Sequence, residues 1–155
     1  MDNRELKRQL QALNDLLDKT SDASSGSIEL QAHWARYICV RVSGFLEIAI
    51  KEIYSDLIKK SSSPKISNYA CNMITQVRNP NSQKFIEIAG MFEPTWREEL
   101  EKYMSDNGRL EAINSIISNR HLIVHGKDSG ITLARLKDYL MKSIEVIEYI
   151  EAQCV

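Results

Sequence analysis

The chain has 155 residues, of which 43% are hydrophobic and 26% are charged, so a folded domain is expected and a disordered chain is excluded. The formal net charge is -1, and basic and acidic residues are balanced within residues 1–60, which excludes a basic shell for passive nucleic-acid binding. If the protein handles nucleic acid, it does so at a local site.

The first two elements are predicted to be a helix over residues 3–19 and a long helix over residues 28–59. Four leucines spaced four, three and four apart mark one face of the first helix, and Ser27 is the expected N-cap of the second. Between Trp34 and Ile50 the long helix is apolar on nearly every side, which is typical of a helix wrapped by its neighbours. We therefore expect it to be the central helix.

Further helical segments follow after a Ser-rich stretch that ends at Pro64. They are expected over residues 66–77, over 85–92, from Pro94 to about Tyr103, over 110–124 with a stop at Gly126, and from Thr132 to near Cys154. Alternating strand patterns and fixed repeats are absent. The predicted fold class is all-α, a bundle of about five to seven helices around residues 28–59, in a single domain of residues 1–155.

The cysteines and the charge pattern predict a cytoplasmic protein that does not enter a membrane. Cys39, Cys71 and Cys154 are odd in number and show no CxxC spacing, which argues against a disulfide framework. Residues 1–6 lack the apolar core of a signal peptide, and charged residues interrupt the most apolar region. Trp34 and Trp96 are predicted to be core or interface anchors rather than platforms for stacking bases.

The segment from Ile116 to Gly126 carries the candidate chemistry. Arg120 projects into the middle of the apolar stripe of its helix, where the charge of a guanidinium needs an anionic partner or a solvent-filled cleft. His121 and His125 flank that stripe. Arginine grips phosphate through two donors, and histidine exchanges protons near neutral pH. In RNA the adjacent 2′-OH is a built-in nucleophile, so such a set could cleave RNA with no metal and no cofactor.

Other interpretations of these residues stay open. His125 could be a capping residue at a helix C-terminus, which favours positive charge. His121 and His125 have the spacing of a zinc-binding pair, although no acidic residue lies between them and no third ligand is obvious. Glu47 either lies beside the motif and orients Arg120, as a possible supporting residue, or pairs with Lys51 at i, i+4.

Two stretches resemble the HEPN family of ribonucleases. Arg120-His121, three further residues and His125 match its signature of arginine, polar residue, spacer and histidine, and Gly126 follows. The stretch from Trp34 to Glu47 is similar to the central helix of the branch called RiboL-PSP-HEPN. The two stretches occur in the expected order, and the helices around them agree, so the resemblance covers most of the chain.

The resemblance implies a homodimer whose two motifs face each other across a cleft. It further implies metal-independent cleavage of RNA that leaves a 2′,3′-cyclic phosphate. By this match Arg120 binds or polarises the scissile phosphate, His125 is the general acid or base, and His121 supports them. The implied biology is a toxin or an antiviral, abortive-infection defence effector, with an antitoxin or another defence subunit as a further partner. The alternative is a non-catalytic HEPN-like module that binds a partner protein or a nucleotide.

Overall fold

The computed structural model describes residues 1–155 and contains seven α-helices and no strands. The helices are α1 (Arg4–Ala23), α2 (Ile28–Ser61), α3 (Pro64–Thr75), α4 (Ser82–Phe92), α5 (Pro94–Met104), α6 (Arg109–Val124) and α7 (Leu133–Gln153). Every predicted helix is present, and the all-α fold class is confirmed. None of the seven combines the length and the apolar character that crossing a membrane requires.

Polar side chains cap the N-termini of several helices. The Ser27 side chain accepts a hydrogen bond from the Leu30 N–H and caps α2, as predicted. Asn3, Asn81 and Thr132 cap α1, α4 and α7 in the same way, and a proline is the first residue of α3 and of α5. Local chemistry therefore determines where these helices begin.

The first helix is longer than predicted. It ends at Ala23 rather than at residue 19, because the Thr20 carbonyl accepts bonds from both the N–H and the hydroxyl of Ser24. Thr20 and Ser24 are both buried, so this last turn packs although its residues are polar. The apolar stripe ends at Leu17, which is why the pattern did not predict this extra turn.

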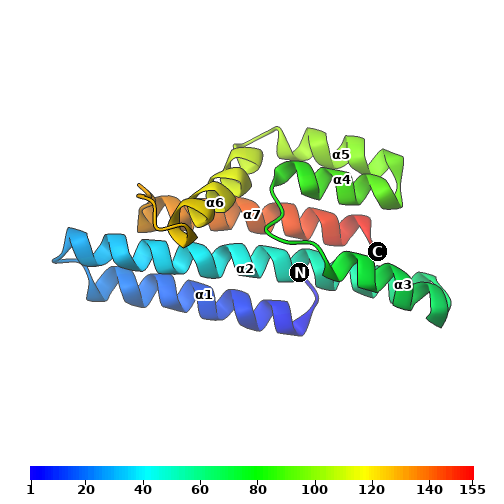
Figure 1. Ribbon diagram of the computed structural model, residues 1–155, viewed down its shortest axis with the longest axis horizontal. Coiled ribbons are helices and arrows are strands. Elements are labelled where there is room, and N and C mark those ends of the chain that lie inside the picture. Colours follow the sequence, from blue (N-terminus) through cyan, green and yellow to red (C-terminus); the bar gives the residue numbers. More distant parts are fainter.

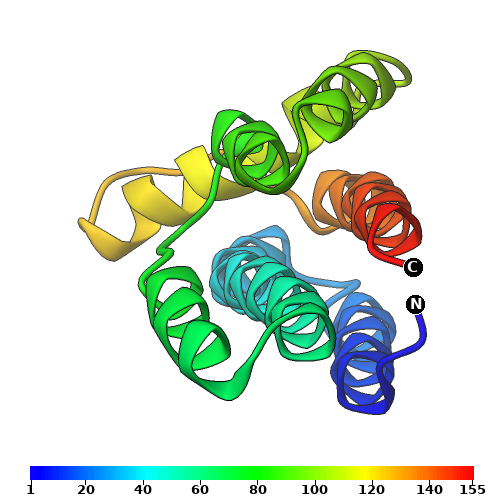
Figure 2. The same ribbon diagram turned by 90° about the vertical axis from the view of Figure 1, so that its right-hand side faces the viewer.

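The long helix α2 lies in the middle of the bundle. Figure 1 shows α1 and α7 running along α2. Helices α4 and α5 lie beyond α7, and α6 runs obliquely from the end of α5 toward the N-terminal half of α2. Seen end-on in Figure 2, α2 is surrounded by α1, α3, α6 and α7, and it contacts all four. The two chain ends meet at the same side of the molecule, where the terminal ammonium lies 2.9 Å from the Glu151 carboxylate.

Side chains of α2 form the centre of the hydrophobic core. Leu46, Ile50 and Tyr54 are 0% exposed. They are part of one continuous cluster with buried residues of the other helices, including Leu6, Leu17, Phe85, Leu100, Ile113, Ile116, Leu136 and Ile147. The prediction that α2 is the central helix is therefore confirmed.

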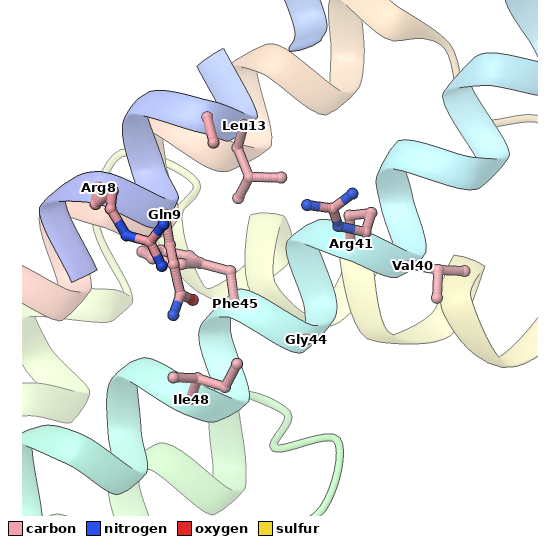
Figure 3. A pocket seen from close by; sticks show the side chains of 9 residues that line it. Arg8, Gln9, Leu13, Val40, Arg41, Gly44, Phe45 and Ile48 are labelled. Atoms are coloured by element: carbon pink, nitrogen blue, oxygen red, sulfur yellow. The ribbon is translucent and has the colours of Figure 1, made fainter. Parts of the chain in front are cut away.

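One face of α2 is not covered, although the helix is apolar on nearly every side between Trp34 and Ile50. Trp34, Tyr37 and Ile48 are 37%, 49% and 40% exposed. Beside this face, side chains of α1 and α2 line an open groove of about 460 Å³, whose labelled residues in Figure 3 include Arg41 and Ile48 of α2. Trp96, in contrast, packs partly buried against the core.

Candidate functional site

Helix α6 positions all three residues of the predicted motif. Its inner face is anchored in the core through Ile113 and Ile116, both 0% exposed. Arg120 follows Ile116 by one turn and is half-buried, whereas His121 and His125 are exposed. The C-terminal half of α6 and the loop after it project at the edge of the bundle (Figure 2). The motif therefore lies where α6 leaves the core and meets solvent.

The end of α6 holds the two histidines close together. His125 is the C-cap residue, and its N–H donates to the His121 carbonyl at 3.3 Å. Gly126 adopts a φ of +67°, the left-handed conformation that glycine tolerates best, and its N–H donates to Ile123. The two imidazole rings lie with their centres 4.4 Å apart and tilted by 60°. One helical turn thus brings two proton carriers side by side.

The three motif side chains are free to bind a ligand. No hydrogen bond or ion pair joins the Arg120 guanidinium to another group of the chain. The imidazoles of His121 and His125 likewise have no hydrogen-bond partner. A half-buried guanidinium without a counterion suits an anionic ligand, because arginine stays charged and presents a fork of donors.

A polar hollow of about 650 Å³ opens beside His121, between α6 and the start of α4. Asn114 and Ser118 line it, and the Asn114 Oδ1 accepts a hydrogen bond from the Ser82 N–H at 3.0 Å, which ties the start of α4 to α6. Neither residue was predicted from the sequence to belong to the site. Asn114 and Ser118 precede His121 by seven and three positions, a spacing that places them on the same face of a helix and could have revealed them.

Glu47 does not join the motif. Its carboxylate lies 2.6 Å from Lys51 Nζ and accepts a hydrogen bond from the Asn79 N–H at 2.7 Å. The guanidinium of Arg78 lies farther from the same carboxylate, with 3.8 Å between Arg78 Nη1 and Glu47 Oε1. No hydrogen bond or ion pair reaches Arg120, so the orienting role considered for Glu47 is corrected: it pairs with Lys51 and anchors the loop between α3 and α4 to α2.

The charge of Glu47 is expected to stabilise the fold in a pH-dependent way. Burial opposes ionisation of this carboxylate, but the bonds from Lys51 and Asn79 outweigh burial and lower the pKa of Glu47 below its ordinary value of 4.5. A carboxyl group with a lowered pKa in the folded chain stabilises that chain above its unfolded pKa, and the contribution is lost as pH falls through the folded value. Glu47→Gln should therefore lower the free energy of unfolding by about 1–2 kcal/mol at pH 7.

Urea unfolding of the native chain and of Glu47→Gln between pH 7 and pH 3 measures this effect. The difference in the free energy of unfolding between the native chain and Glu47→Gln should shrink as the pH falls below 4.5, the ordinary pKa of this carboxyl group. A difference that stays constant over the whole range would show that the charge of Glu47 is not what stabilises the loop.

The cysteine thiols are free, and the side chains that could bind a metal do not cluster. Cys39 is buried, and burial raises the pKa of its thiol to about 12; burial also raises that of Cys154 to about 11. All three cysteines are free. Side chains of His, Cys, Asp and Glu nowhere gather in a group of three that could hold a metal ion, so His121 and His125 have no third protein ligand.

The all-α bundle around one long helix is the fold that the resemblance to HEPN domains implied. The family model of RiboL-PSP-HEPN matches residues 4–155, nearly the whole chain. The protein belongs to the RiboL-PSP-HEPN family, and the resemblance seen in the sequence is confirmed. No curated protein and no solved structure matches the chain.

Proposed function

We propose that this protein is a metal-independent endoribonuclease. The observation that carries the proposal is the end of α6, where a half-buried, unpaired Arg120 is followed one and five residues later by two exposed imidazoles whose ring centres lie 4.4 Å apart. Membership of the RiboL-PSP-HEPN family supports the same activity, since the motif in this chain matches the HEPN ribonuclease signature. A phosphodiester needs a cation for its charge and proton carriers for its two oxygens, and these three side chains supply both.

In the proposed reaction the RNA provides its own nucleophile. One imidazole takes the proton of the 2′-OH, and the 2′-oxygen then forms a bond to the adjacent phosphorus. Arg120 stabilises the negative charge that develops on the phosphate oxygens. The bond from phosphorus to the 5′-oxygen breaks, and this oxygen takes a proton from a second imidazole in its protonated form. The products are a 2′,3′-cyclic phosphate and a 5′-hydroxyl end.

A substrate that lacks the nucleophile tests this scheme. The native chain should cleave an RNA oligonucleotide, and it should not cleave the same sequence with 2′-O-methyl groups throughout, because the 2′-oxygen then has no proton to give. Cleavage of both oligonucleotides would mean that water, rather than the 2′-OH, attacks the phosphorus. Cleavage of neither would favour the second candidate function below.

The active species is proposed to be a homodimer with a composite site. Val124 lies next to the motif and is 46% exposed, and Leu30, Trp34 and Tyr37 leave an apolar and aromatic surface on the N-terminal half of α2. Exposed aromatic side chains are enriched at protein interfaces, and a symmetric partner would cover such a surface. The second copy would add its own Arg/His motif across the cleft.

Light scattering and dilution test the dimer together with its role. The expected mass is twice the 17.8 kDa of one chain at micromolar concentration. The specific activity should fall when dilution carries the protein below the dissociation constant of the dimer, because one copy then lacks the facing motif. A species that stays monomeric and keeps its full activity would rule out the composite site.

In the cell we propose a toxin or antiviral defence effector that acts on RNA in the cytoplasm. Such an enzyme needs restraint, so an antitoxin or another defence subunit that covers the end of α6 is the expected partner. Expression of the native chain should inhibit growth, and His125→Ala should relieve the inhibition. Equal growth inhibition by both would show that toxicity does not depend on the motif.

The second candidate function is a non-catalytic module that binds a nucleotide or a partner protein. It is favoured by one observation: within a single copy, no side chain orients either imidazole of the motif. General acid–base catalysts are ordinarily held by a neighbour, whereas a binding site needs only the charge of Arg120 and the polar hollow beside His121. Binding of an RNA oligonucleotide without any cleavage would support this function.

A further inference from the structure

A second arginine stands near the place where α6 crosses the central helix. The Cys39 Sγ–H donates to the Ile116 carbonyl at 3.6 Å, so these two residues mark a point where α2 and α6 are in contact. Arg36 precedes Cys39 by one turn on α2, and Arg120 follows Ile116 by one turn on α6. In Figure 1 the C-terminal end of α6 descends toward the N-terminal half of α2. By their positions in the sequence, Arg36 and Arg120 belong to the turns of α2 and α6 on that side of the crossing.

Arg36 is a cation without a partner. It is half-buried, and its Nε is fully buried with no hydrogen-bond partner. Two other buried side-chain polar atoms lack a partner, Tyr54 Oη and Gln153 Oε1, but neither belongs to a charged group. The two terminal nitrogens of Arg36 also make no hydrogen bond, but they are not buried, so they stay accessible to a ligand.

The carboxylates of the chain do not neutralise Arg36 or Arg120. The arginines that form ion pairs are Arg8, Arg78 and Arg109. The nearest acidic residues on α2 are engaged elsewhere, because Glu29 faces His33 and Glu47 is held by Lys51. Two half-buried cations that share one crossing and lack a carboxylate are suited to a ligand that carries more than one negative charge.

We propose that Arg36 is a substrate-binding residue that holds a phosphate of the RNA next to the phosphate held by Arg120. The proposal rests on the proposed function for the identity of the ligand. The two terminal N–H groups of a guanidinium form a fork that matches two phosphate oxygens. A ligand phosphate would give these terminal N–H groups the acceptors that the chain itself does not supply. RNA would then enter the site along the N-terminal half of α2.

Binding of an oligonucleotide that cannot be cleaved tests the role of Arg36 separately from catalysis. We would measure fluorescence anisotropy of a labelled 2′-O-methyl RNA with the native chain, Arg36→Gln and Arg36→Lys over a series of salt concentrations. Arg4→Gln is the matched control, because it removes the same charge from an exposed position at the start of α1. Circular dichroism confirms that each variant is folded.

Arg36→Gln should weaken binding by about 10-fold and lower the slope of log affinity against log salt by about 1, since one phosphate contact is lost. Arg36→Lys should keep the salt slope but recover only part of the affinity, because an ammonium cannot form the fork. Arg4→Gln should bind like the native chain. Native affinity in Arg36→Gln would overturn the proposal, and if Arg36→Gln does not fold, native affinity in Arg36→Lys would overturn it.

The two proposals fail in different ways. If the native chain binds the 2′-O-methyl RNA through Arg36 but does not cleave ordinary RNA, the proposed nuclease is wrong and the phosphate site stands. If Arg36→Gln binds the analogue and cleaves ordinary RNA as the native chain does, the nuclease stands and the role of Arg36 is wrong.

Discussion

His125→Ala is expected to slow RNA cleavage by about 10³-fold without unfolding the protein, because it removes one of the two proton carriers at the end of α6. The side chain of His125 is exposed and makes no hydrogen bond, so the fold does not depend on it. Arg120→Ala should lower the rate by about 10²- to 10³-fold, since the developing phosphate charge then loses its cation. Cleavage of a fluorogenic RNA in EDTA measures both variants.

The third histidine of the chain provides the control. His33 is exposed on α2 and lies 3.9 Å from Glu29, so His33→Ala removes the same side chain outside the motif. With saturating RNA, so that a change in RNA binding along α2 does not alter the rate, it should leave the rate within about 2-fold of the native value. If His125→Ala kept the native rate, or if His33→Ala lost activity as far as His125→Ala did, the assignment of the site to the end of α6 would be wrong.

Leu46→Ala is expected to destabilise the fold by about 3–4 kcal/mol, because Leu46 is fully buried at the centre of α2 and its truncation leaves a cavity. Ile48 lies two residues along the same helix but is 40% exposed, which makes Ile48→Ala the matched control, with an expected loss of about 0.5 kcal/mol. Urea unfolding at a protein concentration held constant gives both values.

The contrast between the two positions tests whether α2 has a buried and an open face. Similar losses at Leu46 and Ile48 would mean that both faces of α2 are covered within the folded protein. That result would contradict the open face beside α1 described above.

Local patterns in the sequence were sufficient to predict the helices. Ser27 as a cap and the glycine stop at Gly126 act through neighbouring residues, and both are present in the structure. Helical periodicity also predicted that Arg120 is half-buried. Arg120 lies in the apolar stripe of α6, and that stripe packs against the core. Helix order, the central place of α2 and the clustering of the motif were therefore predictable.

Features that depend on partners far along the chain were not predictable in the same way. The carboxylate of Glu47 accepts a hydrogen bond from the N–H of Asn79, a loop residue 32 positions away. The helical periodicity of the sequence cannot predict such a contact. The open face at Trp34 and Tyr37 is as apolar as a covered one, since apolarity does not say how many neighbours a helix has. The lack of a partner for the half-buried guanidinium of Arg36 is likewise seen only in the folded structure.

The most direct test of the central claim is incubation of the purified native chain with RNA in the presence of EDTA, with the product ends identified by mass spectrometry. We expect fragments that end in a 2′,3′-cyclic phosphate and a 5′-hydroxyl, and no fragments with His125→Ala under the same conditions. Fragments that appear equally with His125→Ala, or that end in a 3′-hydroxyl and a 5′-phosphate, would contradict a metal-independent reaction at the end of α6.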